Sequence, residues 1–293
     1  MAGFARDPIA IAGAGRVAQA LGRLLADRGE PVAAIGGRNP ERTAAAAAFL
    51  GHGVRPLTIT ALPAAAARIL IAVSDAAIPE VARLLAGAGM RSGAALHTCG
   101  VMGAEALAPL AEAGVCCGAI HPLQTFATPE DGLLALPGSA FAIDGGPAAL
   151  AWARRIAQIA GGEAICIPAS ARPLYHAASV MASNYVAALL DAAAILMKEA
   201  GAQSRQQALM AIGRPALASV RNVLHLGTAE ALTGPIQRGD AETVRAHLAA
   251  LAGAPVRIRE LYREAGRYTL EMAIRGGLDA EAAEQIALAL EKG

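Results

Sequence analysis

Short apolar runs alternate with segments of helical spacing along the first half of the chain. The run PIAIA at residues 8–12 stops at Gly13, a pattern typical of a buried strand in a parallel sheet. In residues 16–28 the apolar side chains recur at helical spacing, which predicts an amphipathic helix. Further strands are predicted at 31–36, 68–74, 94–98, 115–120 and 140–144, and further helices at 40–50, 78–88, 104–113 and 147–160.

The alternation ends near residue 168, and the remaining chain has the spacing of helices. Strands that alternate with helices form parallel βαβ units, so the first part predicts an α/β fold of Rossmann type with a doubly wound, mainly parallel sheet. An all-α domain follows it. We therefore expect a dinucleotide-binding domain at 1–168 and a helical substrate and dimerisation domain at 169–293. The predicted helices of the second domain are 173–200, 204–224, 240–251, 255–275 and 279–291.

A glycine-rich turn joins the first predicted strand to the first predicted helix. Its sequence GAGRVA fits the pattern GxGxxA, in which the first glycine allows a tight turn and the second lets the backbone approach a pyrophosphate. The small third residue lets helix and sheet pack closely, and the helix N-terminus offers free N–H groups to phosphates. The turn predicts dinucleotide binding, and the alternative is a Rossmann-like turn that holds no cofactor. The predicted contacts are Gly13, Ala14, Gly15, Arg16 and Val17.

The end of the second predicted strand indicates which dinucleotide binds. NAD sites place a carboxylate there to hold the ribose 2′-hydroxyl, whereas this chain reads GGRN at residues 36–39. The guanidinium of Arg38 suits a 2′-phosphate, and Arg42 lies one turn into the next helix. We therefore predict NADP(H), with Arg38 and Asn39 in its site. The alternative for Arg38 is a solvated arginine in a turn.

Three further residues follow predicted strands at the same edge of the sheet. Ligands of doubly wound sheets lie beyond the carboxyl ends of the strands. Ser74 closes one strand, and Thr98 and Gly100 follow another, so all three are predicted along the cofactor. Asp75 either lies there too or caps the helix that begins near Ile78.

Charge and hydropathy exclude several other classes of partner. The chain of 293 residues carries 25 Lys and Arg against 24 Asp and Glu, so no broad basic surface for nucleic acid is expected. The most apolar long segment, Ala177–Leu190, contains Asn184 and ends at Asp191, and we expect no membrane span. The N-terminus has no long apolar stretch behind basic residues, so we expect it to lead into a strand and not to be a signal peptide.

The cysteines show neither a disulfide framework nor the spacing of metal ligands. Two of the four, Cys116 and Cys117, are adjacent, which suits neither role. This usage indicates a cytoplasmic protein, and no metal site is predicted. The cysteines are interpreted as small buried residues.

Four polar segments carry a resemblance to a known family. They read HTCG at residues 97–100, HPLQTF at 121–126, RPLYHAASVMASNY at 172–185 and TGPIQRGD at 233–240. In this order they resemble the bacterial proteins with a Rossmann-like N-terminal domain and a C-terminal helical domain of unknown function. The resemblance implies an NADP-dependent oxidoreductase related to pyrroline carboxylate reductases, β-hydroxyacid dehydrogenases and ketopantoate reductases.

The chain departs from the β-hydroxyacid dehydrogenases at one important position. In that family the first long helix of the second domain carries a catalytic lysine, followed one turn later by an asparagine. Asn184 matches the asparagine, but the lysine position falls near Val180 or Met181. The missing lysine argues against simple hydroxyacid oxidation. Reduction of an imine, or of a ketone with another proton donor, stays open.

Two histidines are the candidate proton donors of such a reduction. Carbonyl reduction needs a proton donor, and histidine titrates near neutral pH. His121 ends a predicted strand on the cofactor side, and His176 lies in the first turns of the first long helix after residue 168. Each could instead be structural. Asn184 is predicted to orient the substrate or a water, with a helix-packing contact as its alternative.

Gln124, Ser183 and Arg238 are the predicted substrate contacts. Arg238 could hold a carboxylate through two parallel hydrogen bonds, and its alternative is a loop arginine before a helix capped by Asp240. Ser183 and Tyr185 leave the helix in other directions than Asn184, so the three side chains cannot all face one substrate.

The predicted function is an NADP(H)-dependent oxidoreductase that reduces a small carbonyl or imine compound, a carboxylate among the candidates. The alternative is a Rossmann-like nucleotide-binding sensor or scaffold without turnover, and a deazaflavin is a third option for the cofactor. Alanine-rich helices pack closely, so we expect the helical domain to form a homodimer.

Overall fold

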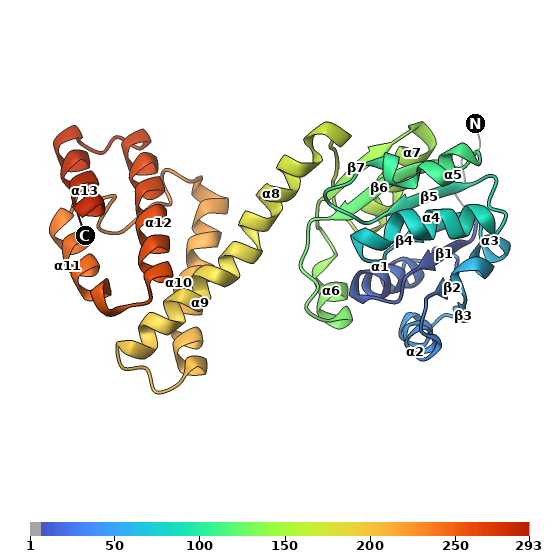
Figure 1. Cartoon of the computed structure of the whole chain (residues 1–293), viewed down its shortest axis with the longest axis horizontal. Coiled ribbons are helices and arrows are strands. Elements are labelled where there is room, and N and C mark those ends of the chain that lie inside the picture. The colour runs from blue at the N-terminus through green and yellow to red at the C-terminus, as the bar shows by residue number, and fades with distance from the viewer. Residues whose placement is uncertain (1–6, 293) are drawn as a thin grey trace. The chain divides into compact units, whose positions relative to one another are not determined.

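The computed structural model describes residues 7–292 and divides the chain into two compact units, Met1–Ser183 and Asn184–Gly293 (Figure 1). The first unit is built on one eight-stranded sheet with the order β3-β2-β1-β4-β5-β6-β7-β8. This confirms the predicted Rossmann-type α/β fold. The strands are β1 (Ile9–Ala12), β2 (Val32–Gly36), β3 (Arg55–Leu57), β4 (Arg68–Ile71), β5 (Ala94–His97), β6 (Cys116–Pro122), β7 (Phe141–Gly145) and β8 (Ala164–Cys166).

The register of the central strands brings their carboxyl ends to one edge of the sheet. Ala12 at the end of β1 pairs with Gly36 of β2 on one side and with Ile71 of β4 on the other. Ile71 in turn pairs with His97 at the end of β5. The loops that follow these four strands therefore lie side by side. Between β6 and β7 the pairing is antiparallel, and the other neighbouring strands are parallel.

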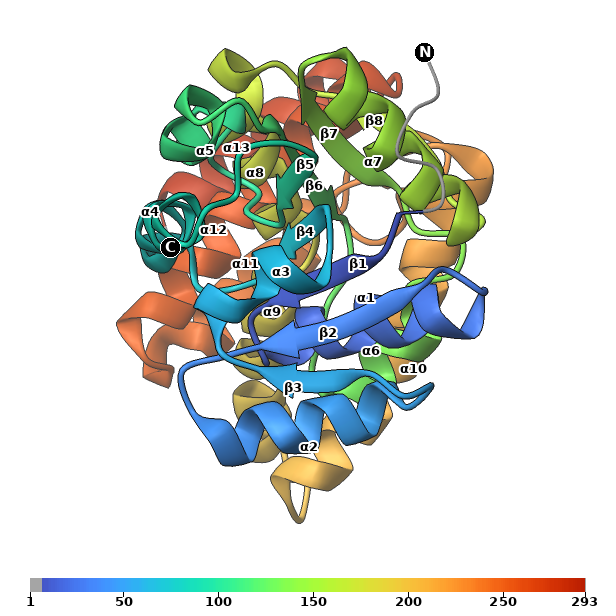
Figure 2. The same cartoon turned by 90° about the vertical axis from the view of Figure 1, so that its right-hand side faces the viewer.

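Helices cover both faces of the sheet (Figure 2). Alternate residues of β1 point to opposite faces: Ile9 and Ile11 pack towards α1 (Arg16–Asp27) and α7 (Pro147–Ile159), whereas Ala10 and Ala12 pack towards α4 (Ile78–Gly87). The two apolar cores that result fix the layers of the fold. The helices of the first unit are α1 (Arg16–Asp27), α2 (Pro40–Leu50), α3 (Leu62–Ala65), α4 (Ile78–Gly87), α5 (Ala108–Glu112), α6 (Pro129–Ala135), α7 (Pro147–Ile159) and α8 (Arg172–Ala182).

Several elements differ from the sequence-based expectation. The short strands β3 and β8 were not predicted. Neither was α6, which follows the HPLQTF segment in the sequence. β3 is a three-residue edge strand that contains Pro56, so it has little of the pattern of a buried strand. The strand predicted at 68–74 ends at Ile71, and the helix predicted at 104–113 begins with the 3-10 turn Ala104–Leu107.

The helix predicted at 173–200 is two helices that meet at Ser183. α8 ends at Ala182 and α9 begins at Asn184, because Ser183 leaves the helical conformation at φ −129° and ψ −71°. The change from α/β to helical elements comes after β8, as predicted near residue 168, while the first compact unit continues through α8 to Ser183.

The second unit consists of α9 (Asn184–Glu199), α10 (Arg205–Leu226), α11 (Ala241–Ala250), α12 (Val256–Arg275) and α13 (Ala280–Lys292). Its apolar core lies between α11, α12 and α13, where Val244, Ile286 and Leu290 are fully buried. The carboxylate of Asp240 accepts a hydrogen bond from the Thr243 N–H at 3.0 Å and caps α11, which confirms the predicted cap.

One helical stretch has the length and composition of a membrane span, which corrects the expectation that none would. Within Ala169–Glu199, an 18-residue window has a mean hydropathy of 1.7, and 6% of that window is buried. The expectation gave weight to Asn184 and Asp191, but the many alanine, leucine, valine and isoleucine residues outweigh them in the average.

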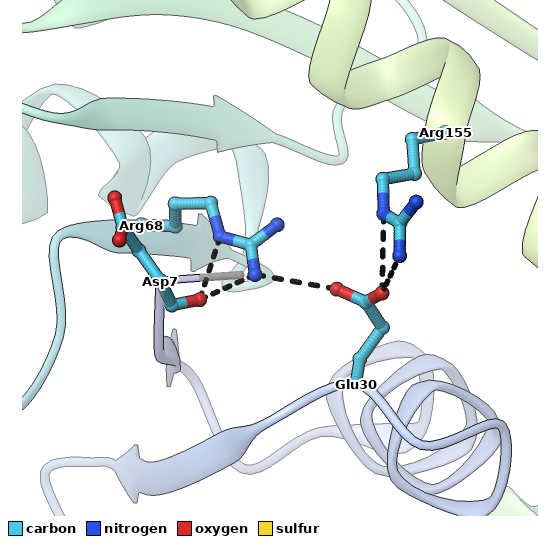
Figure 3. A network of polar contacts seen from close by, with 4 residues as sticks. All are labelled: Asp7, Glu30, Arg68 and Arg155. Carbon is cyan, nitrogen blue, oxygen red and sulfur yellow. Dashed lines mark hydrogen bonds and ion pairs between the residues drawn. The ribbon is translucent and has the colours of Figure 1, made fainter. Parts of the chain in front are cut away.

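The amino edge of the sheet, opposite to the carboxyl ends of the strands, contains a buried ionic network (Figure 3). Arg68 at the start of β4 is fully buried and contacts Glu30 at 3.2 Å, and its side chain also donates to the backbone carbonyl of Asp7. The second carboxylate oxygen of Glu30 accepts from Arg155 of α7 at 2.5 Å. The guanidinium of Arg68 lies 5.6 Å from the ring centre of Trp152. The network ties α7 to the strands at this edge.

Candidate active site

A cavity of about 960 Å³ opens at the carboxyl ends of β1, β2, β4 and β5. It lies within the first unit, where the register brings the strand-end loops together. The loop after β6 contributes Phe126, and the start of α6 contributes Pro129. Of the predicted cofactor contacts, Gly13, Ala14, Gly15, Arg16, Val17, Arg38, Asn39, Ser74 and Thr98 all line this cavity.

The glycine-rich turn has the geometry that close approach of a phosphate needs. Gly13 has φ +124°, and a Cβ there would collide with the backbone carbonyl of Ala72, so only glycine fits. A Cβ on Gly15, in contrast, would meet open space. Gly15 is the N-cap of α1 without a side-chain cap, and Ala18 is fully buried against the sheet. The turn therefore presents bare backbone and a helix N-terminus to the cavity.

Arginines dominate the charge around the cavity. Arg16, Arg38 and Arg42 line it and are exposed. Among the described lining residues the one carboxylate belongs to Glu80, which is paired with Arg83. The side chain of Asn39 accepts a hydrogen bond from the Arg42 N–H at 2.8 Å and caps α2, so its amide has a structural task as well.

Three aromatic side chains meet around His121. His121 lies in β6, and Tyr175 and His176 lie in α8. The Tyr175 hydroxyl is 2.7 Å from Nδ1 of His121, and the two rings meet edge to face with centroids 5.8 Å apart. The His176 ring is also 5.8 Å from that of His121, at an interplanar angle of 76°. The structure thus brings the two predicted proton donors together.

The backbone of Gly100 packs closely against the imidazole rings of His121 and His176. It is buried, and a Cβ there would stand 2.5 Å from Nδ1 of His176 and 3.0 Å from Nε2 of His121. Within residues 7–292, Nδ1 of His176 is buried without a hydrogen-bond partner. Gly100, predicted as a cofactor contact, is therefore placed against the histidines and not among the residues that line the cavity.

Burial keeps His121 and Tyr175 uncharged near neutral pH. Burial, with smaller contributions from His176 and Arg172, lowers the pKa of His121 to about 4. Burial raises the pKa of Tyr175 to about 12. His121 is therefore a neutral imidazole at neutral pH, and Tyr175 keeps its proton.

The loop from Thr98 to Gly103 is held in place by buried polar groups. Nε2 of His97 lies 2.7 Å from the Gly103 carbonyl, and the Cys99 N–H donates to Nδ1 of His97. Arg172, fully buried at the start of α8, donates to the Cys99 carbonyl at 3.1 Å. Burial raises the pKa of the Cys99 thiol, so this cysteine is protonated at neutral pH.

The predicted substrate contacts are spread over the chain. The amide nitrogen of Gln124 donates to the Ala135 carbonyl at 3.0 Å and to Oγ of Ser139 at 3.3 Å, so this side chain holds the segment around α6. The Ser183 hydroxyl donates to the Ser179 carbonyl at 2.7 Å. Asn184 begins α9, and the exposed Arg238 precedes α11, so both belong to the second unit.

Three residues of the site were not given a role from the sequence, namely Tyr175, Arg172 and Phe126. The first two stand in the quoted segment RPLYH, and the third in HPLQTF. The sequence analysis assigned roles to the nearby residues His176 and Gln124 instead, because histidine and glutamine are common in catalysis and binding. The contact between Tyr175 and His121 joins residues far apart in sequence, and local spacing contains no signal for it.

The chain resembles several solved structures over most of its length. A provisionally assigned NADP oxidoreductase from Bacteroides fragilis has a TM-score of 0.73 at 22% identity, covering 92% of this chain and 99% of that one. The 1-pyrroline-5-carboxylate reductase from Streptococcus pyogenes has a TM-score of 0.59 at 18% identity, with 98% and 97% covered. An imine reductase from a Pseudomonas species has a TM-score of 0.58 at 17% identity, with 97% and 92% covered. At these low identities, the TM-scores show a common fold and nothing further.

Family models match two successive regions of the chain. No curated protein matches the chain in sequence. Residues 3–122 match the Rossmann-like domain, and residues 139–269 match the domain of unknown function DUF2520. The chain thus combines a region that matches the Rossmann-like domain with a later region that matches DUF2520, in the order that its four polar segments had indicated.

Proposed function

We propose that this chain is an NADP(H)-dependent oxidoreductase that reduces a small carbonyl or imine compound. The observation that carries the proposal is the cavity at the GAGRVA turn, whose bare glycine backbone and arginines fit a phosphorylated dinucleotide. The likeness in fold to an imine reductase and to a pyrroline carboxylate reductase supports the reaction class.

The residues of the cavity fit the parts of NADP(H) in order. The open space over Gly15 and the N-terminus of α1 would hold the pyrophosphate. Arg38 and Arg42, beyond the end of β2, would hold the 2′-phosphate by charge-assisted hydrogen bonds. Ser74 and Thr98 would follow the cofactor towards its nicotinamide.

The chemistry that remains for the protein is to orient the substrate and manage a proton. When bound, NADPH would supply the hydride. His121 and His176 lie against Gly100, two residues after Thr98, and provide nitrogen atoms that can donate or accept hydrogen bonds. Asn184, Ser183 and Arg238 stay proposals for contacts with the substrate.

We also propose that the protein acts as a homodimer in the cytoplasm. The exposed apolar side chains of α9 and α10 support association, because they leave a broad apolar surface uncovered in one chain. Covering that surface by a second subunit would also account for the high hydropathy of the stretch Ala169–Glu199.

The test is loss of NADPH absorbance with a panel of probes. We would use pyruvate, 1-pyrroline, 1-pyrroline-5-carboxylate, and cyclohexanone with allylamine, each with NADPH and with NADH. The proposal expects oxidation of NADPH by at least one carbonyl or imine probe, and a slower reaction with NADH. Saturable NADPH binding without turnover on any probe would instead support a nucleotide-binding sensor or scaffold.

A further inference from the structure

One side of the cofactor cavity is formed by a single face of α4, which we call the α4 wall. Its residues recur three and four positions apart, which places them on one side of the helix. They are Ala77, Glu80, Val81 and Leu84. α4 also packs against the 3-10 turn Ile59–Ala61, whose Ile59 lines the same cavity. Since this turn follows β3, the neighbour of β2, the α4 wall extends to the end of the cavity where Arg38 lies.

Glu80 is the one acidic residue among the described lining residues of the cavity. The other charged side chains that line it are Arg16, Arg38 and Arg42. A phosphorylated dinucleotide is strongly anionic, so a carboxylate next to its phosphates would oppose binding. A carboxylate only accepts hydrogen bonds, and it therefore favours the complex where the ligand presents a donor.

The ion pair of Glu80 does not prevent such a contact. Its partner Arg83 is not one of the described lining residues, and the two side chains are 51% and 62% exposed. Exposed pairs of this kind contribute little to stability, so the Glu80 carboxylate can accept a hydrogen bond from a ligand in the cavity.

The chemistry of NADP(H) places its base at the α4 wall. The 2′-phosphate is attached to the ribose carbon next to the one that carries the base. A 2′-phosphate on Arg38 and Arg42 therefore brings the base to the same end of the cavity. Val81 and the 38% exposed Leu84 offer an apolar surface to one face of the flat ring. Glu80 lies one turn before Leu84 on the same side of α4 and offers an acceptor to the edge of the ring.

We propose that the α4 wall binds the adenine ring of NADP(H), and that the Glu80 carboxylate accepts a hydrogen bond from the 6-amino group of the base. The inference rests on the NADP(H) binding of the proposed function and not on its reduction step. It makes Glu80 a specificity-determining residue, because adenine presents a donor at this position and guanine presents an acceptor.

The test compares two fragments of the nucleotide that differ by one amino group. The first is 2′,5′-ADP, which contains the base, the ribose and the 2′-phosphate. The second is purine riboside 2′,5′-bisphosphate, the same molecule with hydrogen in place of the amine. Each is titrated against NADPH bound to the full chain, and displacement is followed by fluorescence. We expect 2′,5′-ADP to bind about tenfold more tightly, as the loss of a hydrogen bond to a charged acceptor predicts.

The variant Glu80→Ala should bind the two fragments with affinities within about twofold of each other, because the acceptor is gone. A general effect of the negative charge would change both affinities by the same factor and leave their ratio unchanged. Glu41→Ala is the matched control: Glu41 is exposed, precedes Arg42, and is not one of the described lining residues. This control should keep the tenfold preference of the unmodified protein for 2′,5′-ADP, whereas a preference that survives in Glu80→Ala would overturn the role of Glu80.

The apolar part of the α4 wall is tested by Leu84→Ser. Both fragments have the same ring, so both should bind about fivefold more weakly while their ratio is kept. Leu134→Ser, at an exposed leucine of α6 outside the described cavity lining, should change neither affinity. Unchanged affinities in Leu84→Ser would overturn the placement of the ring on α4.

The outcomes separate this inference from the proposed function. Equal displacement of NADPH by the two fragments, or no displacement by 2′,5′-ADP, would overturn the inference and leave NADPH binding intact. No saturable binding of NADPH would overturn both. A tenfold preference that depends on Glu80 would support the inference whether or not a carbonyl or imine probe is reduced.

Discussion

Glu30 and Arg68 form a buried ion pair at the amino edge of the sheet, at the end opposite to the proposed cofactor cavity. Their side chains are 5% and 1% exposed, and the carboxylate of Glu30 also binds Arg155 (Figure 3). A buried charge that loses its partner is strongly destabilising. This pair therefore bears on the stability of the first unit and not on its chemistry.

Removal of the Glu30 charge should destabilise the fold without loss of cofactor affinity per folded molecule. We expect Glu30→Gln to lower the free energy of unfolding by about 3 kcal/mol, because it leaves the Arg68 guanidinium buried without a counter-charge. Arg155 is 46% exposed, so Arg155→Ala should cost about 1 kcal/mol or less. Urea unfolding measures both, with the exposed Glu112→Gln as control. Equal stability of Glu30→Gln and the control would refute this role.

The depressed pKa of His121 predicts loss of stability in mild acid. Its pKa falls from 6.5 to about 4 on folding, so between these values the unfolded chain binds a proton that the folded chain does not. The free energy of unfolding should therefore fall as the pH falls through this window, by up to about 3 kcal/mol from this group. The charged and titratable groups near His121 are His176, Arg172, Asp75, His97 and Tyr175.

Chemical unfolding at several pH values compares the unmodified protein with His121→Asn. Burial also lowers the pKa of His97, which both proteins retain, so the difference between the two pH profiles isolates His121. The profile of His121→Asn should be flatter. Parallel profiles would show that His121 titrates at its ordinary pKa in the fold.

The two glycines of the turn should respond to alanine in opposite ways. Gly13→Ala forces a Cβ against the Ala72 carbonyl at a positive φ, so we expect a loss of stability of more than 1 kcal/mol. Gly15→Ala meets no protein atom and an ordinary φ of −83°, so the fold should be kept. Its methyl group instead occupies the space proposed for the pyrophosphate, and NADPH binding should weaken. Thermal unfolding and NADPH titration of both variants, run side by side, check this; full NADPH affinity in Gly15→Ala would argue against the proposed pose.

An apolar stripe on α10 predicts self-association of the second unit. Met210, Leu217, Val220 and Leu224 follow one another at the spacing of a coiled-coil seam, and Leu217 and Leu224 are 73% and 83% exposed. We expect twice the chain mass of 29.5 kDa by light scattering for the unmodified protein. Leu217→Arg combined with Leu224→Arg should give the single-chain mass, whereas Leu134→Arg, at an exposed leucine of α6, should not. A monomeric unmodified protein would disprove the dimer.

The sequence was sufficient for the fold and for the place of the glycine-rich turn because both have local patterns. Strand and helix periodicity set the order of the elements, and GAGRVA occurs where a strand meets a helix. The contact between Tyr175 and His121 could not be foreseen in this way, since it depends on how the start of α8 packs against β6. Nor could the sequence show that the amide nitrogen of Gln124, a predicted substrate contact, bonds to the Ala135 carbonyl and to Ser139, because these contacts depend on how the segment around α6 folds. The break at Ser183 also escaped the pattern, because the apolar spacing continues across it.

Binding of NADPH and NADH to the unmodified protein and to Arg38→Ala tests the central claim most directly. In a fluorescence titration we expect saturable binding of NADPH, weaker binding of NADH, and about a tenfold or greater loss of NADPH affinity in Arg38→Ala with NADH affinity little changed. That result would place the 2′-phosphate at the end of β2. No saturable signal for either nucleotide would contradict the account, and equal losses of both in Arg38→Ala would contradict its preference for NADP(H).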